Sequence, residues 1–207
     1  MRGIDYGLAK PFACIWLAFD QDGNCFVYRE SYRTQMTATE QAKLVVEMSK
    51  YPDSLEAYGK DRGKPEVFDR TVADPSVFTK QGSGMSIAQM YLKGGLQVQK
   101  AMNARVDGWN RCRDYLRAND HPHIRIFNTC PNLIDELTFA VRDDRNPEDL
   151  DTTGADHALD AWRYGLAARN RAAKKSKKDR DPRSMSARMD SIIKARKNQG
   201  HEVLGNW

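Results

Sequence analysis

The sequence predicts an α/β fold, on three observations. The run Phe12–Phe19 is eight apolar residues long, less than half of a bilayer span, and Pro11 and Asp20 bound it as they would bound a buried strand. An Asp-Gly pair at 22–23 separates this run from an alternating segment, which is typical of a β-hairpin. From residue 37 onward, apolar residues recur at helical spacing between short strand-like segments.

The first third of the chain predicts a β-meander followed by a helix. Strands are expected at 2–6, 12–19 and 25–32. Thr37, with Glu40 three residues later, forms a capping-box pattern that opens a helix over 38–50.

The remainder predicts strands and helices in alternation, with a polar loop at 142–153. Strands are expected at 66–73, 96–99 and 124–127, and helices at 86–93, 103–118, 130–141 and 154–169. Asp74-Pro75 closes the first of these strands, and Pro131 suits the first turn of a helix. No internal repeat is visible.

The charge distribution predicts two regions. The 207 residues carry a net charge of +5 and suffice for one substantial core. Residues 171–207 hold eleven Lys and Arg against four Asp and Glu, a net +7, which leaves −2 for residues 1–170. We therefore expect a folded domain over 1–170 and a flexible basic tail over 171–207 that reaches a polyanionic partner. The alternative is a solvated tail that only aids solubility.

Cysteines and apolar segments exclude other classes. Cys14, Cys25, Cys112 and Cys130 form no CxxC pair and are interpreted as reduced structural thiols. A zinc site built from Cys130 and two nearby histidines lacks a fourth ligand. No secretory signal opens the chain, and no apolar run is long enough for a membrane span.

Four acidic residues are candidates for chemistry. Asp5 lies in the first strand between apolar and glycine neighbours, which suit a carboxylate only when a cation is near. Asp74 ends a strand, where ligands bind in open α/β sheets. Asp156 and Asp160 are one helical turn apart. Each also has a structural explanation: Asp74 as a turn residue, Asp156 as a partner of the helix dipole, and Asp160 as an ion pair with Arg163.

Carboxylates brought together from distant segments repel one another unless a hard cation holds them. Mg²⁺ or Mn²⁺ suits ligation by oxygen alone, and a pair of such ions activates water and stabilises the leaving oxygen in phosphodiester cleavage. The acidic set therefore predicts a two-metal site.

Three motifs occur in a telling order: GIDYG at 3–7, VADPS at 72–76 leading into GSGMSI at 82–87, and DHALDAWRY at 156–164. Together they resemble the nuclease domain of the large terminase subunit of tailed bacteriophages, over residues 2–170. The last motif is the most specific. The resemblance implies an RNase H-like mixed central sheet, with the first three strands antiparallel and helices flanking it. It also implies cleavage of concatemeric double-stranded viral DNA during genome packaging, in the host cytoplasm.

The resemblance implies a role for each motif residue. Asp5 would be the central metal-bridging carboxylate, Asp74 the second ligand and Asp160 the third. Asp156 and His157 would be further ligands or groups that hold the ligands. Relatives with a glutamate at the second position differ from the all-aspartate set here in reach but not in charge.

Further expectations concern partners and the missing motor. No GxxxxGK[ST] segment occurs, so we expect an excised nuclease domain without ATPase activity, monomeric in isolation, with Met1 supplied for expression. The small terminase subunit and the portal protein are candidate partners. The glycines at 82 and 84 predict a flexible connection near the site. Candidate phosphate contacts are Lys80, Lys93, Lys100 and Arg105.

Two other functions remain open on the sequence. One is another RNase H-like nuclease, such as a junction resolvase or a transposase. The other is a non-catalytic DNA-binding or assembly module with a vestigial acidic cluster. An actin-like ATPase also begins with an aspartate in a glycine-rich hairpin, but its later phosphate and adenosine loops are not evident here.

Overall fold

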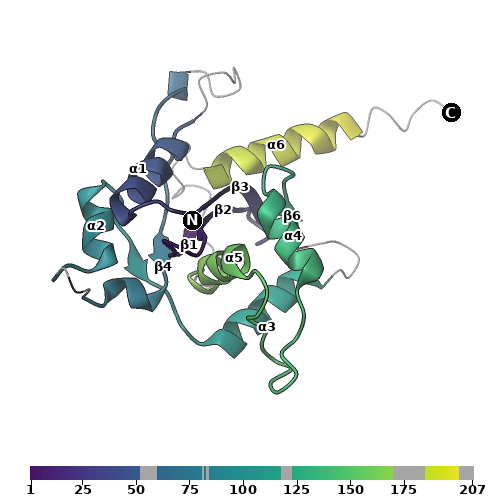
Figure 1. Cartoon of the computed structure of the whole chain (residues 1–207). Helices are drawn as coiled ribbons and strands as arrows, with labels where there is room; N and C mark the ends of the chain where they lie inside the picture. Colours follow the sequence, from purple (N-terminus) through teal and green to yellow (C-terminus); the bar gives the residue numbers. More distant parts are fainter. Residues whose placement is uncertain (52–59, 81, 83, 118–122, 170–184, 201–207) are drawn as a thin grey trace.

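The computed structural model describes residues 1–51, 60–80, 82, 84–117, 123–169 and 185–200, and it has helices on both faces of a six-stranded sheet (Figure 1). The strand order is β5-β4-β1-β2-β3-β6. The β1–β2 and β2–β3 pairs are antiparallel, and the β1–β4, β4–β5 and β3–β6 pairs are parallel. The strands are β1 Arg2–Asp5, β2 Phe12–Phe19, β3 Cys25–Arg33, β4 Thr71–Ala73, β5 Gln99–Lys100 and β6 Ile124–Ile126.

Helices cover the sheet in two layers. They are α1 Ala38–Met48, α2 Ile87–Lys93, α3 Arg105–Leu116, α4 Pro131–Phe139, α5 His157–Ala167 and α6 Met185–Gly200, with a 3₁₀ turn, η2, at Pro75–Phe78. Buried residues of α1, α2 and α6 pack on one face, and those of α3, α4 and α5 pack on the other. Figure 1 shows α5 lying close to β1, with α3 and α4 beyond it. The predicted α/β fold with a mixed sheet is confirmed. Within the described ranges, no helix is long and apolar enough to cross a membrane.

The central strand β2 explains why two cores form. Every residue of Phe12–Phe19 is buried, as the apolar run predicts. Successive side chains of a strand point to opposite faces. Cys14 and Trp16 accordingly join the core under α1 and α2, whereas Ile15 and Leu17 join the core under α5.

Helix starts follow the sequence signals. The Thr37 side chain accepts the backbone N–H of Glu40, and the Glu40 carboxylate accepts the N–H of Thr37, which completes the predicted capping box of α1. Ser86 and Gln89 make the same exchange at α2. All four cysteines are buried free thiols, as predicted. Of the histidines in the zinc alternative, His121 lies outside the described residues.

Two predicted strands differ in length and position. The segment expected at 66–73 contributes only Thr71–Ala73, because its partner β1 offers just Arg2–Ile4 for parallel pairing. The strand expected at 96–99 is instead Gln99–Lys100, since Leu96 is buried in the core under α2 rather than paired in the sheet.

Helix α6 lies beyond residue 170, where the sequence places the end of the folded domain. Met185 and Met189 are buried and belong to the core that α1 and α2 cover. Arg188 forms an ion pair with Asp61, and Gln21 donates to Asp190 at 3.3 Å. Residues 171–184 and 201–207 of the predicted tail lie outside the described residues.

Helix α5 approaches β1 at backbone distance. A Cβ atom added at Gly3 would lie 2.0 Å from the carbonyl oxygen of Ala161 and 2.7 Å from the nitrogen of Gly165. A Cβ atom added at Gly165 would lie 2.5 Å from a methyl group of Leu17. Glycine at both positions therefore allows the helix to rest directly on the strand that carries Asp5.

We expect Gly3→Ala to lower the free energy of unfolding by about 2–3 kcal/mol, because the added methyl group forces backbone atoms of α5 away from β1. Urea unfolding measures the change. Gly154→Ala is the control, since an added Cβ there meets nothing within 4 Å. Equal stabilities of the two variants would show that α5 does not pack against β1 in this way.

Candidate active site

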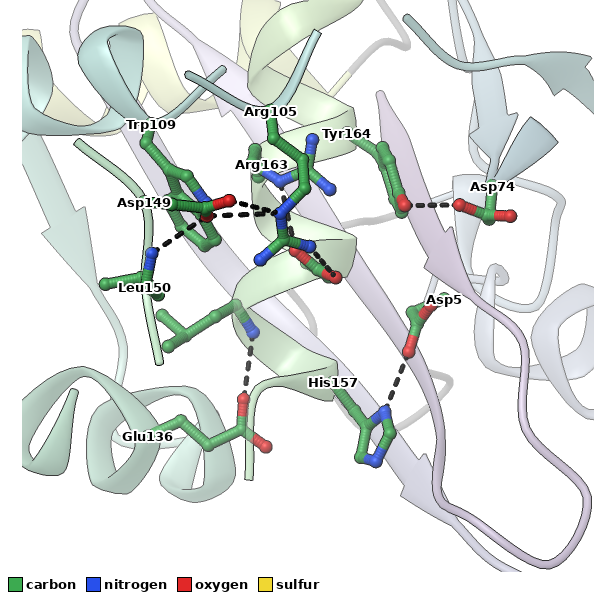
Figure 2. Close-up of polar contacts among 12 residues, drawn as sticks. Asp5, Asp74, Arg105, Trp109, Glu136, Asp149, Leu150, His157, Arg163 and Tyr164 are labelled. Atoms are coloured by element: carbon green, nitrogen blue, oxygen red, sulfur yellow. Dashed lines mark hydrogen bonds and ion pairs between the residues drawn. The ribbon is translucent and has the colours of Figure 1, made fainter. Parts of the chain in front are cut away.

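Helix α5 contacts three of the predicted carboxylates. The Nδ1 atom of His157 lies 2.9 Å from Oδ2 of Asp5, and Tyr164 donates its hydroxyl to Oδ2 of Asp74 (Figure 2). On the helix itself, Nε of Arg163 donates to Oδ1 of Asp160 at 3.0 Å. The carboxylates from β1, β4 and α5 are therefore all bonded to side chains of one helix.

Sheet register places Asp5 and Asp74 at the same edge. Strands β1 and β4 are parallel, and Ile4 pairs with Ala73, so the next residue of each chain is an aspartate at the carboxyl end. The N–H of Asp74 donates to the carbonyl of Ile4 at 3.2 Å. This arrangement follows the rule that ligands bind where parallel strands end.

Helical spacing supplies the third carboxylate and its neighbours. His157, Asp160 and Tyr164 are separated by three and four residues, so they share the face of α5 that meets the two strand ends. All three side chains come from the DHALDAWRY motif.

Asp5 is the carboxylate with the strongest demand for a cation. Burial raises the pKa of Asp5 to about 6, the negative charges of Asp160 and Asp74 add to the rise, and the bond with His157 opposes it. Only 16% of the Asp5 side chain is exposed. The bond to Asp5 also raises the pKa of His157, which favours an imidazolium that donates to the carboxylate.

Asp74 has the opposite character. Burial acts to raise the pKa of Asp74, but hydrogen bonds from Ser76 and Tyr164 outweigh it and leave the pKa below its usual value. The backbone N–H of Ser76 donates to Oδ1 at 2.7 Å, so Asp74 also caps η2. The interpretation of Asp74 as a turn residue is thus correct as well, since the same carboxylate has both neighbours.

Two arginines bind Asp160. Arg163 lies on its own helix, is fully buried, and is stacked between Trp109 and Tyr164, with ring centroids 5.3 and 4.4 Å away. Arg105 of α3 donates from Nη1 to Oδ2 of Asp160 at 3.2 Å. Its Nε also donates to Asp149 at 3.1 Å, so the loop before α5 is tied to the carboxylate cluster (Figure 2).

Asp156 sits at the N-cap position of α5 but makes no capping bond with its side chain. Its carbonyl accepts the N–H of Asp160 at 2.8 Å. Burial raises the pKa of Asp156, and the charge of Asp160 adds to the rise. The carboxylate therefore belongs to the same electrostatic cluster, whereas its predicted pairing with the helix dipole takes no capping form.

The donor set suits a hard divalent cation. Within the described part of the chain, no three His, Cys, Asp or Glu side chains already stand close enough to grip an ion. The charges nevertheless indicate a fit, because Asp74 and Asp160 both raise the pKa of buried Asp5. Asp5, Asp74 and Asp160 offer the oxygen ligands that Mg²⁺ and Mn²⁺ prefer, and binding requires Asp160 to turn from its arginines.

The four predicted phosphate contacts lie in different settings. Lys80 lines an open groove of about 370 Å³ with Gln89 and Gln97, Lys93 is at the end of α2, and Lys100 is exposed on β5. Arg105, in contrast, is bonded to two carboxylates inside the site. Of the glycine-rich connection, Ser83 lies outside the described residues.

Sequence reasoning did not assign roles to Tyr164, Asp149 or Glu136. Tyr164 was identifiable, because it stands one turn after Asp160 in the same motif. Glu136 also left a signal, as an acidic residue three positions after Leu133 on the apolar face of α4. Asp149 is one of several charged residues in a polar loop, and nothing in the sequence distinguishes it.

Comparison with known proteins turns on the fold. No protein-family model matches the sequence, and no curated protein matches it. The structure of the P22 large terminase nuclease domain superposes with a TM-score of 0.61 at 21% identity, covering 81% of this chain and 79% of that one. The chain has the fold of a large-terminase nuclease domain.

The large terminase of a thermophilic bacteriophage has the same fold. Its structure gives a TM-score of 0.57 at 20% identity and covers 80% of this chain. The complex of that terminase with ADP gives a TM-score of 0.58 at 20% identity. The chain spans 38% of the thermophilic phage protein in each case. The RNase H-like fold implied by the three sequence motifs is thus confirmed.

Proposed function

We propose that this protein is a Mg²⁺- or Mn²⁺-dependent endodeoxyribonuclease that cleaves concatemers of double-stranded viral DNA during genome packaging. One observation carries the proposal: side chains of α5 are bonded to three carboxylates, at the strand ends where a fold shared with terminase nuclease domains places its ligand crevice.

Each residue of the cluster has a proposed task. Asp5, Asp74 and Asp160 would hold the metal ions, with Asp156 beside them. When bound, the ions supply Lewis acidity and lower the pKa of water, which is the chemistry that phosphodiester hydrolysis needs. His157 orients Asp5 through Nδ1–H, Tyr164 orients Asp74, and Arg163 orients Asp160.

Double-stranded DNA is the proposed partner, bound through its backbone and therefore with little sequence preference. Lys80, Lys93 and Lys100 are proposed phosphate contacts. The small terminase subunit and the portal protein are proposed protein partners, the host cytoplasm is the proposed location, and ATP hydrolysis is not expected of this chain. The basic segment 171–207 is proposed to bind DNA or one of these proteins.

Plasmid cleavage tests the function. The purified protein is expected to nick and linearise supercoiled plasmid with Mn²⁺ or Mg²⁺ and to lose this activity with EDTA. A preference for four-way junctions over linear duplex would instead identify a resolvase. DNA binding that survives chelation, with no cleavage under either metal, would identify a binding module.

Arg105→Gln is expected to tighten Mn²⁺ binding by about tenfold, because it removes a cation from beside the cluster and frees Oδ2 of Asp160. Isothermal titration calorimetry measures the affinity. Arg113→Gln is the matched control, since Arg113 is an exposed residue of α3 that bonds to the carbonyl of Glu148 at 2.8 Å and not to Asp160. Weaker Mn²⁺ binding by the Arg105 variant would mean that Arg105 presents Asp160 to the metal.

A further inference from the structure

The first turn of α5 is capped from another helix. No side chain at the N-cap position of α5 bonds to the free N–H groups of its first turn. Instead, Oε2 of Glu136, in α4, accepts the N–H of Leu159 at 2.9 Å, and the glutamate is only 7% exposed (Figure 2). Such a bond satisfies a donor that helix geometry leaves unpaired and places negative charge at the positive end of the helix dipole.

The position of this cap gives it a bearing on the cluster. Leu159 lies between His157, which contacts Asp5, and Asp160. A carboxylate that fixes the N–H of Leu159 therefore fixes the backbone turn from which both side chains project. The Asp5 side of the contact is set independently, by pairing of β1 with β2 and β4.

Glu136 is itself held in place by a second buried carboxylate. Glu30 of β3 accepts the N–H of Asn132 at 2.9 Å and the N–H of Leu133 at 3.0 Å, at the start of α4, whose N-cap residue also makes no capping bond. The two glutamates form a chain of contacts from the sheet to α4 and from α4 to α5.

We propose that Glu136 is a positioning residue for the nuclease reaction: it sets the first turn of α5 so that His157 and Asp160 stand correctly against Asp5. This inference rests on the proposed function for its catalytic part. Glu136 touches neither substrate nor metal, and its effect passes through the backbone of Leu159.

Three variants test the proposal. Glu136→Ala removes the cap, Glu136→Gln keeps an oxygen that can accept the Leu159 N–H, and Glu30→Ala is the matched control that removes the cap of α4. We expect Glu136→Ala to lower kcat by about 10–100-fold with KM for duplex DNA nearly unchanged. Glu136→Gln should restore most of kcat. Glu30→Ala should lower the urea midpoint with a much smaller loss of kcat.

A second readout does not depend on cleavage. In metal-free protein, the imidazole NMR resonances of His157 should shift in Glu136→Ala and stay near their wild-type positions in Glu136→Gln and Glu30→Ala. Failure of the wild-type protein to cut DNA would overturn the proposed nuclease and leave this spectral test standing. Unchanged His157 resonances in Glu136→Ala would overturn the positioning role, as would an equal loss of kcat in Glu136→Ala and Glu30→Ala. If Glu136→Ala does not fold, an inactive but folded Glu136→Gln would overturn it.

Discussion

Asp5→Asn is expected to reduce DNA cleavage to about a thousandth or less, while making the metal-free protein more stable near pH 7. The loss of activity follows from removing the carboxylate that lies between Asp74, Asp160 and His157. The asparagine keeps the shape of the side chain and can still accept a bond from His157. Its neutral amide cannot supply the charge that a divalent cation requires.

The gain in stability follows from the pKa of Asp5. Burial raises this pKa from 3.8 to about 6, so the folded state binds a proton more tightly than the unfolded state does. The contribution of Asp5 to stability is therefore full below about pH 4 and is lost as the pH rises through 6. An asparagine carries no such loss, and we expect it to add on the order of 1 kcal/mol at pH 7.

Plasmid cleavage with Mn²⁺ and urea unfolding at pH 4 and pH 7 check both parts of this prediction. Asp135→Asn is the control, because Asp135 is an exposed residue of α4. Retained cleavage by Asp5→Asn would remove Asp5 from the catalytic set. Destabilisation at pH 7 would show that the ionised carboxylate is held favourably by His157 even without metal.

The double substitution Met185→Ala and Met189→Ala is expected to lower the free energy of unfolding by about 3–5 kcal/mol, because both side chains of α6 are buried in the core under α1 and α2. Urea unfolding measures the loss. Ile192→Ala in the same helix is the control, since Ile192 is 48% exposed and should cost less than about 1 kcal/mol.

This prediction separates two roles of the segment after residue 170. Deletion of 171–207 would remove basic charge and core-forming methionines together, so a loss of DNA affinity would have two explanations. Replacing Lys and Arg by Gln changes the charge alone, and the salt dependence of DNA affinity then reports phosphate contacts. A loss of stability below about 1 kcal/mol in the double methionine variant would show that α6 does not belong to the core.

Local signals predicted most of the fold. The bounds of β2, the hairpin after it and the Thr37–Glu40 capping box depend on neighbouring residues, and all three are found in the structure. The length of β4 was not predictable, because it is limited by the four residues of β1, far earlier in the chain. The packing of α6 was also missed, since Met185 and Met189 stand in a segment dominated by basic residues.

The site was predicted as a set of acids but not as a network. Asp5, Asp74 and Asp160 attract attention as acidic residues in apolar or strand-end positions. Their partners are found only when the chain folds, because the Tyr164–Asp74 contact joins residues 90 positions apart and the His157–Asp5 contact joins residues 152 apart. Whether a side chain such as Arg105 binds phosphate or carboxylate depends on which groups the fold places within its reach.

The two glycines between β1 and α5 have a consequence for redesign of this protein. Where side chains separate a helix from a sheet, substitutions in the core can change the spacing between them. Here the carbonyl of Ala161 and the backbone of Gly3 are in direct contact, so the distance between strand and helix is fixed by main-chain atoms. Strand β1 and helix α5 should therefore be transplanted as one unit, while the core under α1 and α2 can be repacked without altering the spacing of the carboxylates.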